Sequence, residues 1–242
     1  MTVHRFHVPE AAPGARLTLP EHSAHHAREV LRLRPGAVVR VFDGGGAEFE
    51  ALLDSVTRKE VTARVTAAVP ARAESPLFVS LAVAALKGDR MELVIQKATE
   101  LGVGELRPVI TARTDAAARP ALQGSRQDRW DKVASGAAEQ CGRAVVPRVA
   151  PTAMLDALAA EPFAGLRLVL APEATDSPFG AAGDVAAVQA LVGPAGGWED
   201  RELARLREAG FTPVRLGPRI LRAETAAVAA VALAQALWGD LR

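Results

Sequence analysis

Apolar residues in the N-terminal third of the chain stand in short runs or alternate with polar ones, which is the spacing of β-strands. The run Val38–Phe42 ends at the turn sequence Asp43-Gly44-Gly45-Gly46, and Val61–Val69 places valine or alanine at every second position. Phe49–Leu53 is a further strand candidate, and Ser23–Leu33 has the pattern of one short helix. The region predicts a small, mostly β, barrel-like module.

The pattern changes after Pro76, where apolar runs alternate with stretches of helical spacing. Leu77–Leu86 is almost wholly apolar, typical of a strand buried on both faces, and Met91–Leu101 then repeats apolar residues at helical intervals. Further strands are predicted at Val109–Thr111, Leu166–Leu170, Ala190–Val192 and Val214–Leu216, and further helices at Arg129–Gln140, Trp198–Ala209 and Glu224–Leu237. This alternation predicts an α/β domain with a parallel sheet.

A break in the pattern separates the two regions. Residues 70–76 contain two prolines and no large apolar side chain. We therefore expect two domains, with a small β domain at residues 1–74 and an α/β domain at residues 75–242.

Composition and charge narrow the class of protein. Hydrophobic residues make up 49% of the 242 positions and charged residues 24%, as in an ordinary globular protein and unlike a disordered chain. The net charge is +1, with ten basic and nine acidic residues before position 75 and 19 of each after it. Because neither part is basic overall, any affinity for a nucleic acid must come from the local placement of arginine.

The sequence also argues against a disulfide, a cysteine-rich zinc site, a signal peptide and a membrane span. Cys141 is the only cysteine, so an internal disulfide and a cysteine-rich zinc site are excluded. The first seven residues lack the pattern of a signal peptide, and the longest apolar stretch, Ala223–Trp238, is too short and too polar for a membrane span. We expect a cytoplasmic protein with no membrane partner and no metal.

Two glycine-containing segments follow predicted strands, at the edge where parallel sheets bind ligands. Val192–Trp198 opens a helix, so its glycines and free amides suit a polar ligand, although it is neither a Walker A loop nor a dinucleotide fingerprint. Leu216–Thr225 carries two arginines and places Ile220 and Leu221 in a loop. Apolar loop residues beside glycine suit a flat aromatic ligand, and a buried crossover loop is the alternative.

Three other segments have the residues for chemistry or binding. Lys87–Gly102 follows a buried strand and is either a ligand-contacting turn or a capped helix with a solvated charged face. Glu139–Arg143 ends a predicted helix, and its Cys141 has no neighbouring activator in the sequence, which favours a structural cysteine. His22–Arg34 is basic and suits either phosphate contacts or a merely solvated helix.

Taken together, these segments resemble the RsmE family of 16S ribosomal RNA uridine-N3 methyltransferases in the SPOUT superfamily. The matching stretches, in family order over nearly the whole chain, are His26–Gly36 with Phe42-Asp43-Gly44, Lys87–Gly102, Glu139–Arg143, Val192–Gly197 and Leu216–Ala226. One position departs from the family pattern, because Ala195 stands where the family usually has the glutamate of Gly-Pro-Glu-Gly-Gly. A mechanism that depends on that carboxylate does not apply to this chain.

The resemblance implies a fold, a cofactor and a partner. The fold is an N-terminal PUA-like RNA-binding β-barrel followed by a SPOUT methyltransferase domain, whose parallel sheet ends in a C-terminal trefoil knot. The cofactor is S-adenosylmethionine, and the substrate is one uridine of 16S rRNA in the decoding region of the 30S ribosomal subunit, methylated at N3. The resemblance further implies a homodimer.

It also implies roles for individual residues. The expected catalytic residues are Arg219, Arg222 and Glu224, of which the arginines would stabilise negative charge on the uracil and Glu224 would act as a base or as their partner. The residues expected to contact the cofactor are Leu170, Pro172, Val192, Gly193, Pro194, Gly196, Gly197, Leu216, Gly217, Ile220, Leu221 and Thr225. Those expected to contact RNA are His26, Arg28, Arg32, Arg34, Lys87, Arg90 and Arg143.

Three competing functions fit parts of the sequence. A non-catalytic RNA-binding or ribosome-assembly protein of the same fold would account for Ala195. A SPOUT enzyme acting on another RNA, such as a ribose 2′-hydroxyl of transfer RNA, is disfavoured by Ile95–Val103 and Glu139–Arg143. A nucleotide-dependent oxidoreductase on an ordinary doubly wound sheet lacks its dinucleotide fingerprint.

Overall fold

The computed structural model describes residues 3–118, 126–175 and 183–241. Contacts divide the chain into two compact units, of which the first is Met1–Glu74 with Ser135–Val146 and the second is Ser75–Ala134 with Pro147–Arg242. The sequence pattern contains no sign that Ser135–Val146 packs with the first unit, because these residues have only the pattern of a helix end. The helix α3 (Gln127–Cys141) accordingly contributes residues to both units.

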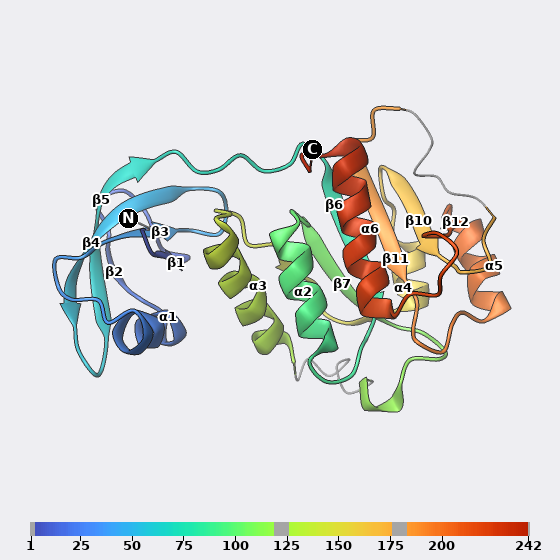
Figure 1. Cartoon of the computed structure of the whole chain (residues 1–242), viewed down its shortest axis with the longest axis horizontal. Helices are drawn as coiled ribbons and strands as arrows, with labels where there is room; N and C mark the ends of the chain where they lie inside the picture. The colour runs from blue at the N-terminus through green and yellow to red at the C-terminus, as the bar shows by residue number, and fades with distance from the viewer. Residues whose placement is uncertain (1–2, 119–125, 176–182, 242) are drawn as a thin grey trace. The chain divides into compact units, whose positions relative to one another are not determined.

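The first unit is built on one curled sheet (Figure 1). Its strands are β1 (Arg5–His7), β2 (Arg16–Thr18), β3 (Val38–Phe42), β4 (Glu48–Val56) and β5 (Val61–Val69). Their order is β1-β3-β4-β5-β2, and only the β1–β3 pair is parallel. Register shifts between β4 and β5 bend the sheet, as β-bulges do. The described strands thus form a half-barrel with β1 and β2 at its edges, and the closed barrel expected from the sequence is not formed by them.

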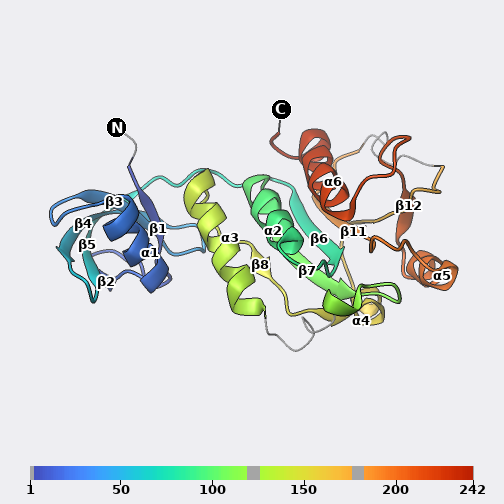
Figure 2. The same cartoon turned by 60° about the horizontal axis from the view of Figure 1, so that its bottom comes forward.

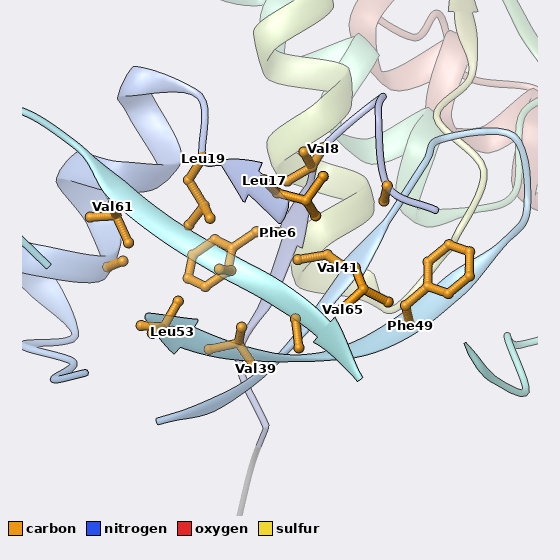
Figure 3. Packing of buried hydrophobic residues seen from close by; sticks show 14 of the residues in the cluster. Phe6, Val8, Leu17, Leu19, Val39, Val41, Phe49, Leu53, Val61 and Val65 are labelled. Carbon is orange, nitrogen blue, oxygen red and sulfur yellow. The ribbon is translucent and has the colours of Figure 1, made fainter. Parts of the chain in front are cut away.

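The concave side of this sheet holds the core of the first unit. Figure 3 shows the side chains of Phe6, Val39 and Leu53 gathered there, and each is at most 1% exposed. The predicted helix Ser23–Leu33 is present as α1 (Glu21–His25) followed by a π-helical turn, His26–Val30. It ends earlier than predicted, since Arg32 takes a positive φ of 51°, which breaks the helix.

The second unit contains a parallel sheet, as the strand–helix alternation predicts. Its strands are β6 (Phe78–Ala84), β7 (Glu105–Ile110), β8 (Arg148–Val149), β9 (Ala153–Met154), β10 (Leu166–Leu170), β11 (Ala187–Val192) and β12 (Thr212–Val214). The order is β12-β10-β11-β6-β7-β8, with β9 also paired to β7. The chain therefore passes from β10 to a neighbour on one side and later returns to the other side of β10, which makes β10 a topological switch point.

Helices cover both faces of this sheet. They are α2 (Arg90–Glu100), α4 (Leu155–Ala160), α5 (Asp200–Glu208) and α6 (Ala223–Trp238), together with the start of α3. Helices α2 and α6 pack side by side, and α6 lies on β6 and β11 (Figures 1 and 2). On the other face, Leu158 of α4 and Leu206 of α5 share a buried cluster with Ala82 of β6.

The differences from the predicted elements are largest where strands are short or carry polar residues. Strand β7 starts at Glu105 rather than Val109, because its first residues alternate polar and apolar and hydrogen-bond to β6. Strand β12 ends at Val214, so Leu216, predicted to lie in a strand, belongs to the following loop. Strands β8 and β9 and helix α4 are too short to give a periodic pattern.

Two kinds of feature are absent from the described ranges. None of their helices combines the length and the apolar character that crossing a membrane requires. Nor do these ranges contain a cluster of three or more histidine, cysteine, aspartate or glutamate side chains able to hold a metal ion.

Candidate functional site

A cavity of about 710 Å³ lies at the carboxyl ends of β10, β11 and β12 in the second unit. Three loops line it, at residues 170–173, 192–198 and 214–224, and Leu86 and Arg90 add to its wall. The switch point explains its position, because the connections that follow the adjacent strands β10 and β11 leave in opposite directions and open a crevice above the strand ends. This is the edge at which the sequence predicts a ligand site.

Trp198 ties two of these loops together. Its indole Nε1 donates a hydrogen bond of 2.8 Å to the carbonyl oxygen of Leu170, so the loop after β11 is fastened to the end of β10. The indole is buried and lies so close to Gly193 that a Cβ atom there would be 2.7 Å from Trp198 Cε2. Gly193 is therefore required for packing, whatever its role toward a ligand.

Hydrogen bonds within the turn between β11 and α5, and from Arg113, hold its conformation. Gly197 has a φ of +73° and donates its N–H to the carbonyl oxygen of Pro194 at 2.9 Å. Arg113 Nη1 donates to the carbonyl oxygen of Gly196 at 3.0 Å. Helix α5 then starts with a reciprocal capping box between Glu199 and its third helical residue. The turn is thus ordered before any ligand arrives.

The loop between β12 and α6 brings arginines and apolar side chains to the same cavity. Ile220 lines the cavity and is 86% exposed, so its side chain is accessible to a ligand there. Arg219 and Arg222 are also exposed, and within the described parts of the chain neither has an ion-pair or side-chain hydrogen-bond partner. Glu224, in the first turn of α6, lies 3.9 Å from Nε of Arg90.

The arrangement suits an elongated ligand with one flat apolar part and several polar groups. Glycines and apolar side chains form two walls, and the third loop carries Arg215, Arg219 and Arg222, none of which has an ion-pair partner among the described residues. Arginine donates in a fixed planar fork, so Arg219 and Arg222 can stabilise negative charge that develops on a substrate.

The structure brings most of the predicted cofactor-contacting and catalytic residues together. Every one of them lines the cavity except Thr225, which lies exposed in the first turn of α6. Arg90, predicted to bind RNA, also lines it, and Lys87 lies outside, paired with Asp115 at 3.1 Å. Sequence reasoning missed Trp198 as a wall residue, although its place directly after the glycine turn was visible.

The residues predicted to contact RNA in the first unit differ in exposure. His26, Arg32 and Arg34 are exposed, and Arg28 donates to Glu29 at 2.7 Å and to the carbonyl oxygen of Thr57 at 3.1 Å. Their side chains are accessible from solvent, as a phosphate-contacting surface requires.

Arg143, which is also predicted to contact RNA, is less accessible than these residues. Its side chain is only 11% exposed, and its Nε donates to both carboxylate oxygens of Glu74, at 3.0 and 3.1 Å. This ion pair joins two segments of the first unit that are 69 positions apart in the sequence.

Glu139, from the same sequence segment, belongs to a polar network inside the first unit. Its Oε1 accepts hydrogen bonds from the backbone N–H of His7 at 2.8 Å and from Ser23 Oγ at 3.2 Å, and Nδ1 of His7 lies 2.8 Å from Ser135 Oγ. Burial raises the pKa of the Glu139 carboxyl, and these hydrogen bonds oppose part of that shift. Burial lowers the pKa of the His7 ring. The segment Glu139–Arg143 thus anchors α3 in the first unit.

Two models of known protein families match the chain, one in each region. Residues 73–235 match the model of an RNA methyltransferase domain, and residues 19–66 match that of an RNA methyltransferase PUA domain. The fold and the site therefore define the class as RNA methyltransferases that carry a PUA domain.

Individual relatives narrow this class. A ribosomal RNA small subunit methyltransferase E from Synechocystis is 35% identical over 95% of this chain and 76% of its own length, and that of Bacillus subtilis is 32% identical over 90% and 88%. A crystal structure of the Neisseria gonorrhoeae enzyme of this name, bound to S-adenosylmethionine, superposes with a TM-score of 0.87. A structure of a Legionella pneumophila methyltransferase in complex with the same cofactor superposes with a TM-score of 0.93. They are 35% and 36% identical and cover 100% of both chains. The chain belongs to the ribosomal RNA small subunit methyltransferase E family.

Proposed function

We propose that this protein binds S-adenosylmethionine and methylates N3 of one uridine in 16S rRNA, uridine-1498 of the small ribosomal subunit. The single observation that carries the proposal is the 710 Å³ cavity at the switch point, whose third loop carries Arg215, Arg219 and Arg222 without ion-pair partners among the described residues. The names of the relatives and the cofactor in two similar crystal structures support the reaction class. The choice of uracil N3 rests on the family resemblance.

The residues at the cavity fit this cofactor. The volume is within the usual range for small-molecule sites, about 300–1,000 Å³. Leu170, Gly193 and Leu216 would border the cofactor from the three loops, and the exposed side chain of Ile220 would cover its flat base. When bound, S-adenosylmethionine supplies an electrophilic methyl group on a sulfonium centre.

The protein's own contribution is to bind the uracil and to stabilise its anion. N3 of uracil carries a proton, and its loss spreads negative charge over O2 and O4. The guanidinium groups of Arg219 and Arg222 would donate to those oxygens and lower the N3 pKa, so that more of the bound base is nucleophilic. Glu224 would accept the proton or orient Arg90, which lies 3.9 Å away. Holding base and cofactor aligned supplies a further part of the rate.

N3 lies on the Watson–Crick edge, so the target base must be unpaired or turned out of its helix. His26, Arg28, Arg32 and Arg34 would contact the RNA backbone from the first unit, with Lys87 and Arg90 from the second. Contacts of this kind make the affinity for RNA fall steeply with salt.

The proposal also covers the domain bounds, a knot in the chain and the oligomeric state. A PUA-like domain at 1–74, a methyltransferase domain at 75–242 and a trefoil knot at the C-terminal loops are part of it. So is a homodimer, for which the exposed Leu233 and Leu237 on the alanine-rich α6 are the supporting feature. Light scattering should give twice the chain mass of 25.4 kDa, and a stable monomer would contradict this part.

The decisive experiment uses small subunits from cells that lack this methylation. They are incubated with the protein and S-adenosylmethionine, and the rRNA is then read by primer extension. Because N3-methyluridine cannot form a Watson–Crick pair, a new strong stop should appear one nucleotide before uridine-1498. No new stop, or a stop at another base, would defeat the proposal.

A pair of matched variants tests the residues. Arg222→Ala should slow methyl transfer in single turnovers at saturating cofactor by at least tenfold, since one charged hydrogen bond is worth about 1.5–3 kcal/mol. Arg205→Ala removes an arginine of α5 that is 63% exposed and paired with Asp156, and it should leave the rate unchanged. Equal rates in the two variants would exclude Arg222 from the reaction.

Ala195 motivates one alternative, a protein of this fold that binds RNA without catalysis. The residue lines the cavity and is exposed, at the position where the family usually has glutamate. Calorimetry with S-adenosylmethionine separates the two functions, because only the methyltransferase requires the cofactor. Binding with methyl transfer supports our proposal, and absence of binding supports the alternative.

A further inference from the structure

A second cavity, of about 190 Å³, lies wholly within the first unit. Its charged lining residues are Arg5, Arg40, Arg72 and Glu48, and Val3, Pro70 and Gly142 complete the wall. None of these residues lines the larger cavity described above. We name this second cavity the arginine cavity.

The arginine cavity has an excess of positive charge. Glu48 is its only acidic lining residue, and the Glu48 side chain is 4% exposed. Both carboxylate oxygens accept hydrogen bonds from Arg5, at 3.0 and 3.1 Å, while Arg40 Nη1 is 3.7 Å from Oε1. The lining thus contains three guanidinium groups and one carboxylate, which leaves two positive charges in excess.

Arg5 is fully engaged and forms the floor of the cavity. Beyond Glu48, its Nη1 donates to the carbonyl oxygens of Ala138 and Glu139, and its Nη2 donates to that of Arg143. These bonds cap the carbonyl end of α3, so the role of Arg5 is accounted for by the fold.

Arg40 and Arg72 are not accounted for in this way. Arg40 lies beside Arg5 in the β1–β3 register and opposite Glu50 in the β3–β4 register. Its Nη1 is 3.7 Å from Glu48 Oε1, which is too long for a hydrogen bond, and its guanidinium donates no hydrogen bond within the described residues. Among the residues that the structure describes, Arg72 has no ion-pair partner, and its guanidinium lies over Gly142, where a Cβ atom would be 3.0 Å from Arg72 Cζ. The fold holds both groups in place and leaves their donors open.

We propose that the arginine cavity binds one phosphodiester group of the RNA substrate, with Arg40 and Arg72 as its donors. Planar guanidinium forks match the oxygens of a phosphate, and a bound phosphate supplies the negative charge that the cavity lacks. The inference rests on the proposed function, because RNA is the phosphate-bearing partner. None of the residues predicted from the sequence to contact RNA lines this cavity.

The test compares a double variant with a matched control. Arg40→Gln with Arg72→Gln keeps much of the side-chain length and removes both open donors, while Arg5 continues to hold Glu48. Arg64→Gln removes an exposed arginine of β5 in the same unit, whose partner Asp54 is 3.7 Å away. Binding of a fluorescent 16S rRNA transcript is measured over a salt series from about 50 to 200 mM, and circular dichroism checks that each variant is folded.

We expect the double variant to bind the transcript about tenfold more weakly at low salt, with a salt slope smaller by about 1, the loss of one phosphate contact. The control should keep both the affinity and the slope of the wild type. The Arg72→Gln single variant, which touches no buried carboxylate, should show part of the same loss and covers the case in which the double variant is unstable. An unchanged affinity and slope in these folded variants would overturn the inference.

Two companion measurements distinguish RNA from a free anion as the ligand and keep the proposed function separate. If inorganic phosphate raises the unfolding temperature of the wild type but not of the double variant, while both bind the transcript equally, the cavity takes a free anion and the RNA assignment is wrong. Cofactor binding and primer extension are measured on the wild type. Their failure would overturn the proposed function, whereas the effect of the double variant on RNA affinity is read independently of both.

Discussion

Replacing Gly193 by alanine perturbs the cavity at a defined contact, because the three atoms nearest to the added Cβ all belong to Trp198. A Cβ at this position would lie 2.7 Å from Cε2 and 2.9 Å from Nε1 of Trp198, closer than the 3.0 Å below which something must shift. The indole must therefore move, and its 2.8 Å hydrogen bond to the carbonyl oxygen of Leu170 must lengthen or break.

The expected cost follows from these two effects. A buried donor left without its partner costs about 1–3 kcal/mol, and forcing extra volume into a packed site costs about 1–3 kcal/mol. We expect Gly193→Ala to lower the free energy of unfolding by about 3 kcal/mol, which corresponds to about 6–12 °C in thermal unfolding for a chain of this size. The affinity for S-adenosylmethionine should fall as well, because the same loop lines the cavity.

Two controls isolate the contact. Gly136→Ala, in helix α3, places its Cβ in open space and should raise stability by about 0.5–1 kcal/mol, since alanine is the better helix former. In a Trp198→Phe background, where the clashing indole atoms are absent, the cost of Gly193→Ala should shrink markedly. An equal cost in both backgrounds, or a variant as stable as the wild type, would refute this reasoning.

Three further outcomes are expected. Burial holds the pKa of His7 below its ordinary value of about 6.5. The stability that comes from its neutral ring is therefore complete above that pH and is lost as the pH falls toward the lowered pKa of the folded state. In denaturant titrations His7→Gln should lose less stability than the wild type between about pH 7 and 5, and equal losses would contradict this. Arg143→Ala should lower the free energy of unfolding by about 2 kcal/mol, less than for a fully buried pair because the Glu74 side chain is 32% exposed. The control Arg148→Ala changes a side chain that is 73% exposed and should cost little. Similar costs in the two variants would argue against a buried Arg143–Glu74 pair. S-adenosylmethionine at about one hundred times its dissociation constant should stabilise the protein by about 2.7 kcal/mol in thermal unfolding, and an unchanged transition would argue against a preformed site.

Much of the candidate site was predictable because each of its loops is a short segment that carries its own sequence signal. The glycines of Val192–Gly197 and the arginines of Leu216–Thr225 follow buried strands, and ligands of parallel sheets gather at that edge. The ion pair of Arg143 could not be predicted, for the opposite reason. A charged residue after a helix end is usually solvated, and only its distant partner Glu74 makes it a buried structural group.

The sequence by itself determined the longer strands and helices and the positions at which glycine or a loop arginine would follow a strand, because such signals depend on a few neighbouring residues. It did not indicate the short elements β1, β2, β8, β9 and α4. The tertiary structure alone decided that β12 pairs with β10, that Trp198 closes onto Leu170, and that Ser135–Val146 packs with the first unit. It also decided that Arg5, Arg40 and Arg72 share one cavity. These features join residues far apart in the chain, and their free energy comes from packing and sheet order, which no local pattern records.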